Sequence, residues 1–312
     1  MRMPEVLIAE ISGKRPGNSN DRPTENFQFD FDKVIISNNS EGYETDWDII
    51  NVPDEYQQWY KDNVKTSDLA YYAPMNRSYA IKYARDHGYK YLIQLDDNIK
   101  TFEIGYQLKD GRRYRTIAST PGIRTMHNDM FGYLVEVLKN TNAGIAGMSV
   151  AGASVPGADF LSERYVYSAF ALKLDVIPDY YQGDFEDDIE FRLKLKQKNI
   201  PSIVIAPFRY MKTSQNANND TTGNRKAYVD AGLERGGHMS KLYGDFYSAG
   251  LSSRGSGTAR TGNVGFRHKL TPFKVGVRIS NRDKLESLMT DLLVKYATPR
   301  KDKLQISSDV EK

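Results

Sequence analysis

The sequence predicts an α/β fold in which helices flank a mostly parallel, mixed sheet. Two observations lead to this prediction. Short apolar runs alternate along the chain with segments whose apolar residues recur at helical spacing. The runs are also apolar throughout rather than at every second position, as expected for parallel strands that are buried on both faces. A chain of 312 residues is long enough for one large domain of this kind or for two small ones.

The expected elements follow in order from these patterns. Strands are expected where Val, Ile, Leu and Tyr cluster, at residues 6–11, 34–36, 49–52, 91–95, 144–150, 165–172 and 200–206. Helices are expected from residue 53 through Trp59 and at residues 78–87, 126–138, 186–198 and 283–297. The polar, basic segment 101–125 is expected to be a loop or hairpin, and segments 13–25 and 211–223 are expected to be loops.

Composition excludes several classes of function. The absence of cysteine excludes disulfides, thiolate catalysis and cysteine-based zinc or iron–sulfur sites. A net charge of +3 gives the chain no overall basic character, so the distribution of charge matters more than its sum. No stretch reads as a signal peptide or reaches membrane-spanning length. We therefore expect a cytoplasmic protein without membrane contact.

A first acidic centre, Asp96-Asp97-Asn98, directly follows the expected strand 91–95. In open α/β sheets, ligands bind outside the carboxyl ends of the strands. Hard oxygen ligands at that position suit Mg²⁺ or Mn²⁺ carrying a diphosphate. The alternative is ordinary turn chemistry, because Asx side chains also bond the backbone of their own turn. His238 is a further candidate metal ligand, although a lone histidine is more often structural.

A second acidic centre, Glu186-Asp187-Asp188, lies in the first turn of the expected helix 186–198. The helix macrodipole stabilises anions there, which is a sufficient structural reason for acidic residues. Three adjacent acids, however, exceed what capping needs. Their mutual repulsion raises a carboxyl pKa, as a general base requires. Glu186 and Asp187 are therefore the candidate bases.

Polar and basic residues near these centres are candidates for binding anions. Asn76 and Arg77 precede the expected helix 78–87, where backbone N–H groups and a cation could meet a nucleotide. A helix cap and a surface charge are the alternative. Later in the chain, residues 246–282 contain no acid, and such a basic stretch suits a polyanion or a solvated surface. The candidates for contact with a polyanion are Arg112, Arg113, Arg254 and Arg260.

Together these motifs resemble those of GT-A fold glycosyltransferases over roughly residues 6–206. The turn Asp96-Asp97-Asn98, the segment 186–192 and the segment 74–80 carry the resemblance. It implies a nucleotide-sugar donor, expected to be a UDP-sugar, contacted by Asn76, Arg77 and Asp96. It implies Mn²⁺ or Mg²⁺ held by Asp97, Asn98 and His238, with Glu186 or Asp187 as base. The family's third turn residue is usually Asp, so whether Asp97 or Asn98 contacts the metal stays open.

More narrowly, the chain resembles the TET-associated glycosyltransferases of bacteriophages in residues 95–98, in residues 183–188 and in its cysteine-free basic tail. This resemblance implies transfer of a sugar to 5-hydroxymethylpyrimidines, such as 5-hydroxymethylcytosine, in DNA of a phage-infected cell. The 5-hydroxymethyl group projects into the major groove, where its hydroxyl is accessible. A base facing the leaving group would favour inversion, and the four arginines would contact the acceptor DNA.

The resemblance also gives an expected domain division. Residues 1–245 would form the GT-A catalytic domain, and residues 246–312 a basic C-terminal extension that ends in an amphipathic helix. Three other functions stay open from the sequence. They are a GT-A glycosyltransferase acting on a saccharide or protein hydroxyl, a metal-dependent nucleotidyltransferase, and a non-enzymatic DNA-binding module built on the basic tail.

Overall fold

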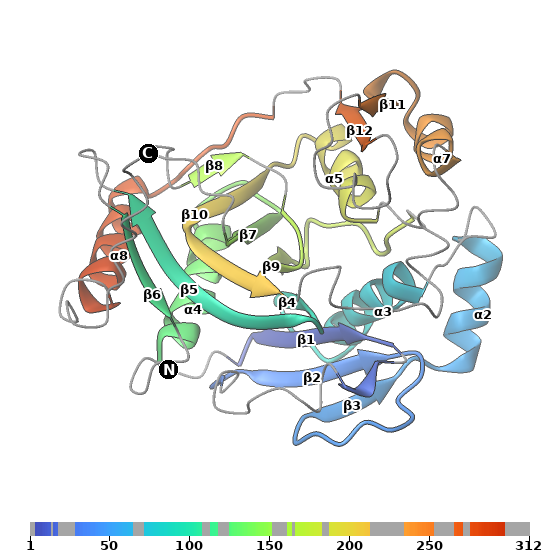
Figure 1. Cartoon of the computed structure of the whole chain (residues 1–312), viewed down its shortest axis with the longest axis horizontal. Helices are drawn as coiled ribbons and strands as arrows, with labels where there is room; N and C mark the ends of the chain where they lie inside the picture. The colour runs from blue at the N-terminus through green and yellow to red at the C-terminus, as the bar shows by residue number, and fades with distance from the viewer. Residues whose placement is uncertain are drawn as a thin grey trace.

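The computed structural model describes residues 4–13, 15–17, 29–64, 72–107, 113–117, 125–151, 161–163, 166–182, 187–212, 234–252, 265–270 and 275–296. Within these ranges, ten strands form one sheet in the order β3-β2-β1-β4-β9-β7-β10-β5-β6, with β8 paired to β10 off this path (Figure 1). The strands are β1 (Val6–Ser12), β2 (Asp32–Ser37), β3 (Asp48–Asn51), β4 (Tyr91–Asp96), β5 (Ile99–Gln107), β6 (Arg113–Ile117), β7 (Ile145–Val150), β8 (Leu161–Glu163), β9 (Ala169–Lys173) and β10 (Ser202–Lys212).

The helices of the described residues are α2 (Asp54–Asn63), α3 (Tyr72–Asp86), α4 (Thr125–Lys139), α5 (Asp187–Gln197), α7 (Glu234–Tyr243), η2 (Gly244–Phe246) and α8 (Arg282–Tyr296). Two further strands, β11 (Tyr247–Ser252) and β12 (Gly265–Leu270), pair in an antiparallel sheet of their own. None of these helices has the length and apolar character that crossing a bilayer requires.

The main sheet combines parallel and antiparallel pairs. β1 pairs in parallel with β2 and β4, β2 with β3, and β7 with β10. β9 lies between β4 and β7 and is antiparallel to both, so those two strands run in the same direction. The carboxyl ends of β1, β4, β7 and β10 therefore share one edge of the sheet. The predicted α/β fold with a mixed sheet and flanking helices is confirmed.

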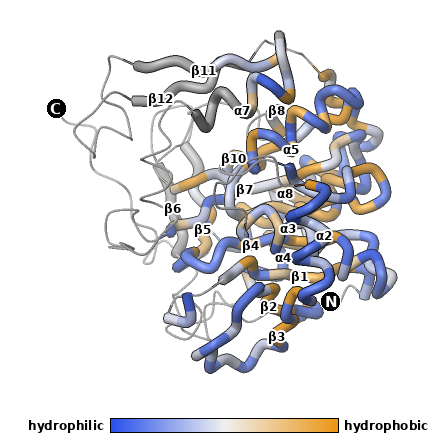
Figure 2. The backbone as a smooth tube through the Cα atoms, turned by 90° about the vertical axis from the view of Figure 1, so that its right-hand side faces the viewer, coloured by the Kyte–Doolittle hydropathy of each residue, from blue (hydrophilic) through white to orange (hydrophobic). Residues whose placement is uncertain are grey.

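Each face of the sheet carries its own apolar cluster. Along β1, Val6 and Ile8 belong to the cluster that includes α4 and α8, whereas Leu7 and Ala9 belong to the one that includes α2, α3 and α5. This alternation follows from the two-residue period of a strand. In Figure 2, hydrophobic stretches recur along the central strands and hydrophilic ones along the connections. The central strands β1 and β4 are thus buried on both faces, as their apolar runs predict.

Most expected elements are present, and the clearest correction concerns α3. This helix begins at Tyr72 instead of Ser78, so Asn76 and Arg77 lie inside it and not ahead of it. Pro74 marked a boundary in the sequence pattern, but proline is tolerated in the first turn of a helix. The expected segment 101–125 contains the β5–β6 hairpin, which extends the main sheet. Neither α7 nor the β11–β12 pair was expected, because those segments are rich in glycine and serine.

The expected C-terminal amphipathic helix is α8, and it packs against α4. Leu285, Met289 and Tyr296 of α8 are buried in the same cluster as α4. Tyr133 of α4 donates a hydrogen bond to the Leu285 carbonyl at 3.1 Å, and Lys295 forms an ion pair with Asp129 at 2.6 Å. α8 therefore contributes to the core of the main sheet. The division at residues 245 and 246 remains a prediction.

A buried histidine in α4 is expected to make folding sensitive to acid. His127 packs against the rings of Phe29 and Phe102, with centroids 5.8 and 5.2 Å away, and burial lowers its pKa from 6.5 to about 4. Below pH 6.5 the unfolded chain gains a proton that the folded protein does not. The free energy of unfolding should therefore fall as the pH drops from 6.5 toward 4, by up to about 3 kcal/mol.

Urea unfolding of His127→Leu across this pH range tests the expectation. The variant should lose much of the dependence on pH, because it has no imidazole to protonate in the unfolded state. His87→Leu, which removes an exposed imidazole instead of a buried one, is the matched control. An unaltered pH slope in His127→Leu would contradict the assignment.

Candidate active site

Asp96, the last residue of β4, lies at the shared carboxyl edge of the sheet. Its Oδ1 is 2.5 Å from Nη2 of Arg77, and its Oδ2 is 3.7 Å from Nζ of Lys212. Burial opposes ionisation of this carboxyl, but Arg77 and then Lys212 hold its pKa below its ordinary value. Asp96 is therefore a carboxylate that two cations keep ionised at the point where α/β sheets bind ligands.

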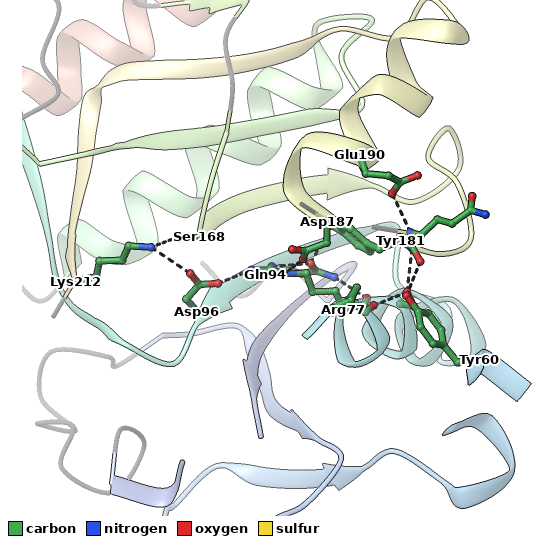
Figure 3. Close-up of polar contacts among 12 residues, drawn as sticks. Tyr60, Arg77, Gln94, Asp96, Ser168, Tyr181, Asp187, Glu190 and Lys212 are labelled. Atoms are coloured by element: carbon green, nitrogen blue, oxygen red, sulfur yellow. Dashed lines mark hydrogen bonds and ion pairs between the residues drawn. The ribbon is translucent and has the colours of Figure 1, made fainter. Parts of the chain in front are cut away.

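Arg77 joins the two acidic centres that the sequence predicted separately. Its Nε is 3.0 Å from Oδ2 of Asp187, while its Nη2 contacts Asp96 (Figure 3). Only 8% of the Arg77 side chain is exposed, so Arg77 is not a solvated surface charge. Arg77 also lies inside α3, so it does not cap the start of that helix. A single guanidinium thus holds the end of β4 against the start of α5.

The local sequence of β4 explains why this arginine can be buried. Gln94 alternates with apolar neighbours and points to the face covered by α3, where it is completely buried. Its Oε1 accepts hydrogen bonds from Arg77 Nη1 at 3.3 Å and from the Tyr181 hydroxyl at 3.1 Å. Its Nε2 donates to the Arg77 carbonyl at 2.9 Å, and the Tyr60 hydroxyl of α2 donates to the Tyr181 carbonyl at 2.8 Å. These bonds fix the orientation of the guanidinium.

Asp187 is the first residue of α5 and has a perturbed carboxyl. Burial raises its pKa to about 7, and the nearby Asp188 and Asp96 add to this effect, whereas Arg77 opposes it. A carboxyl that changes its protonation state near neutral pH is suited to general-base chemistry. The other candidate base, Glu186, lies outside the described residues.

Asp97 and Asn98, which follow Asp96 in the turn after β4, differ in whether their side-chain oxygens already have partners. Asp97 is buried, accepts a hydrogen bond from Ser12 Oγ at 2.7 Å, and forms an ion pair with Arg15 at 3.0 Å. Oδ1 of Asn98 is also buried but accepts no hydrogen bond from any residue that the structure describes. An unpaired buried acceptor needs a donor or a cation. Asn98 therefore offers a free oxygen at this turn, while both oxygens of Asp97 are occupied.

These oxygens are the donor atoms that Mg²⁺ and Mn²⁺ prefer, so Asp96 and Asn98 fit the implied metal in chemistry. They do not form a ready-made cluster, however. Across the described ranges, no group of three or more His, Cys, Asp or Glu side chains is arranged to hold a metal ion. A metal at this turn would therefore have to take further ligands from a substrate or from water.

Asn76 also lies at this edge, inside α3. Its Nδ2 donates to the Ser12 carbonyl at 2.8 Å and to Asn38 Oδ1 at 3.1 Å, which ties the ends of β1 and β2 together. Its own Oδ1 is buried without a donor among the described residues. Asn76 is thus placed beside the ends of β1 and β2, and its Oδ1 has no donor among the described residues.

The sequence patterns did not mark Arg15, Gln94 or Lys212 as residues of this site, nor Ser168, whose Oγ accepts a hydrogen bond from Lys212 Nζ at 2.9 Å. Gln94 had a readable signal, because an amide inside an apolar strand needs a polar partner. Lys212 follows the expected strand 200–206 and belongs to a β10 that is longer than its apolar run. No local pattern marked Arg15 or Ser168.

Several predicted site residues lie outside what the structure describes. Arg112, Arg254 and Arg260 fall in ranges that are not described. Arg113 belongs to β6 and His238 to α7, but their side chains are not described. The roles predicted for these residues stay predictions.

Comparison with known proteins places the chain in a family. The family model for TET-associated glycosyltransferases matches residues 56–221, a range that includes Arg77, Asp96 and Asp187. A crystal structure from Desulfovibrio desulfuricans, provisionally described as a nucleotide-diphospho-sugar transferase, is similar at 8% identity and a TM-score of 0.33, covering 76% of this chain and 99% of that chain. No match was found among curated proteins. Because the family model spans more than half of the 312 residues, the chain belongs to the TET-associated glycosyltransferase family.

Proposed function

We propose that this glycosyltransferase moves a sugar from a nucleotide-sugar, expected to be a UDP-sugar, to the hydroxyl of 5-hydroxymethylpyrimidine in DNA. Family membership supports sugar transfer. The observation that carries the proposed chemistry is the Arg77 bridge, with Asp96 at 2.5 Å and Asp187 at 3.0 Å from one guanidinium. This contact puts a donor-side carboxylate and a candidate base within one site.

On the donor side, Asn98 would hold Mn²⁺ or Mg²⁺ at this turn, with Asp96, Asp97 and His238 as further candidate ligands. The unused Asn98 oxygen supports Asn98 over Asp97 as a direct ligand. A bound metal supplies positive charge to the diphosphate leaving group. Asp97 instead fixes the turn by its contacts to Ser12 and Arg15. Asn76 would contact the nucleotide through its unused acceptor.

On the acceptor side, Asp187 would take the proton from the 5-hydroxymethyl group, with Glu186 as the alternative base. As the hydroxyl oxygen forms a bond to the anomeric carbon, the bond from that carbon to the diphosphate oxygen breaks. A base opposite the leaving group favours inversion at the anomeric carbon. Arg77 keeps Asp187 at a fixed distance from Asp96 and so aligns the two halves of the reaction.

Binding of DNA would depend on basic segments around the site. Arg112, Arg113, Arg254 and Arg260 are proposed to contact phosphates of the acceptor. The acid-free segment 246–282 supports this role by its charge alone. Phosphate contacts of this kind make binding strongly dependent on salt.

A direct transfer assay tests the proposed function. The protein is incubated with UDP-glucose, UDP-galactose or UDP-N-acetylglucosamine and Mn²⁺, and with duplexes that carry 5-hydroxymethylcytosine, 5-hydroxymethyluracil or 5-methylcytosine. Mass spectrometry of the digested nucleosides should show one added sugar on a hydroxymethylated base and none on 5-methylcytosine. Transfer to a saccharide but not to DNA, or release of pyrophosphate in place of UDP, would overturn the proposal.

A further inference from the structure

We propose that Arg15 and Lys212 form a two-cation clamp that binds the diphosphate of the donor from the two sides of the Asp96-Asp97 turn. The inference rests on the proposed nucleotide-sugar donor and adds the residues that would neutralise its phosphates. Neither residue was a candidate from the sequence.

Lys212 is held at the sheet edge, and among the described residues its ammonium group donates one hydrogen bond. Its Nζ donates to Ser168 Oγ at 2.9 Å, and Asp96 Oδ2 lies 3.7 Å away, beyond hydrogen-bond distance. An ammonium group carries three N–H donors. The side chain is 28% exposed. Lys212 can therefore keep its contact with Ser168 and still donate to a phosphate oxygen.

Two irregular backbone features produce this contact. The register between β10 and β5 shifts between Met211 and Lys212, and an irregularity in the strand pairing changes the direction of the side chain that follows it. Ser168, immediately before β9, has a φ of 59°, a left-handed conformation that is uncommon for residues other than glycine. Costly backbone conformations of this type cluster at functional sites. Here both features meet at one Nζ–Oγ contact beside Asp96.

Arg15 occupies the corresponding position beside Asp97. It follows the end of β1, forms its ion pair with Asp97 at 3.0 Å, and is 43% exposed. Asp97 also accepts a hydrogen bond from Ser12, which fixes the carboxylate that Arg15 pairs with. Each of the two adjacent acids therefore positions one partly exposed cation.

This arrangement suits a diphosphate better than a single anion. Arginine can bind two oxygens of one phosphate with its planar fork, and lysine acts as a compact point charge. Arg77 is the third cation at this turn, but its side chain is buried against Asp96 and Asp187 and does not serve the clamp. When the sugar leaves, negative charge develops on the diphosphate, and cations already in place stabilise it without rearrangement.

Calorimetric binding measurements test the clamp. UDP, GDP, CDP and dTDP are first titrated into the wild-type protein, and the tightest diphosphate is then compared with its monophosphate and its nucleoside. Lys212→Met and Arg15→Met should each weaken binding of the diphosphate roughly 10–100-fold, with a smaller loss for the monophosphate and none for the nucleoside. Ser168→Gly, which accepts the left-handed backbone but lacks Oγ, should weaken diphosphate binding by a smaller factor.

Lys82→Met is the matched control, because Lys82 also pairs with a carboxylate, at 2.7 Å in α3, but lies on an exposed helix surface. It should bind the diphosphate as the wild type does. Equal diphosphate affinity in wild type, Lys212→Met and Arg15→Met would overturn the clamp while leaving the proposed function intact. If the wild-type protein bound none of the four diphosphates, the proposed donor itself would be wrong and the clamp would fall with it.

Discussion

Asp187→Asn is expected to lower the rate of sugar transfer by about 10²–10⁴-fold while the donor still binds. The substitution keeps the shape of the side chain but removes the group that accepts the proton from the acceptor hydroxyl. Single-turnover transfer to hydroxymethylated DNA measures the loss. Calorimetric titration of the donor checks that binding persists. Asp179→Asn is a suitable control, because Asp179 precedes the same motif but its side chain is 82% exposed.

The pH profile of the wild-type enzyme gives a second test of Asp187. Burial raises the pKa of this carboxyl to about 7, so the base is protonated below that pH and ionised above it. Transfer should therefore rise with pH between about 6 and 8 and then level off. If Asp187→Asn kept the wild-type rate or the wild-type pH profile, Asp187 would not be the base. Glu186 would then be the first alternative.

Arg77→Met is expected to give the largest loss of stability, about 3–5 kcal/mol in the free energy of unfolding. The loss arises because the variant leaves Asp96 and Asp187 without their shared cation in a largely buried site. Arg77 holds the pKa of Asp96 in the folded protein below its ordinary value of 3.8, so this contribution is present above that value and is lost as the pH falls through the lower folded pKa. The part of the deficit that comes from Asp96 should thus persist from neutral pH down to about pH 4 and shrink only below it.

Urea unfolding of Arg77→Met measures this deficit, and second substitutions identify its cause. Adding Asp96→Asn or Asp187→Asn should recover part of the lost stability, because each removes one unpaired carboxylate. Arg282→Met provides the control, since Arg282 forms an exposed pair with Glu286 at 3.2 Å and such pairs contribute little. A deficit no larger than that of Arg282→Met would show that the bridge is energetically unimportant.

The sequence predicted the elements that carry the site better than the contacts between them. The apolar run before Asp96 and the acids at the start of α5 are local patterns, and both elements are present in the structure. The Arg77 bridge is not local, because it joins α3 to β4 and to α5. Arg77 was expected ahead of a helix that in fact includes it. Pattern reasoning placed this residue in the site but not in its buried, bridging position.

In the turn at residues 96–98, too, the sequence did not show which contacts each side chain makes. From the sequence, Asp97 and Asn98 were equivalent candidates for a metal. The difference between them comes from Ser12, which lies 85 residues earlier and bonds to Asp97, and from Arg15 nearby. Contacts of that separation depend on the pairing of β1 with β4. Only the assembled sheet therefore distinguishes an occupied carboxylate from a free carboxamide oxygen.

The position of β9 has a consequence for the order in which the chain can fold during synthesis. β9 separates β4 from β7 and pairs with both, although it follows them in the sequence (Figure 1). Until residue 173 has left the ribosome, β4 and β7 each lack this neighbour and expose backbone groups that can pair with another chain. A nascent chain stalled before β9 should therefore recruit more chaperone than one stalled after β9, in which β4 is paired on both sides and β7 still lacks β10.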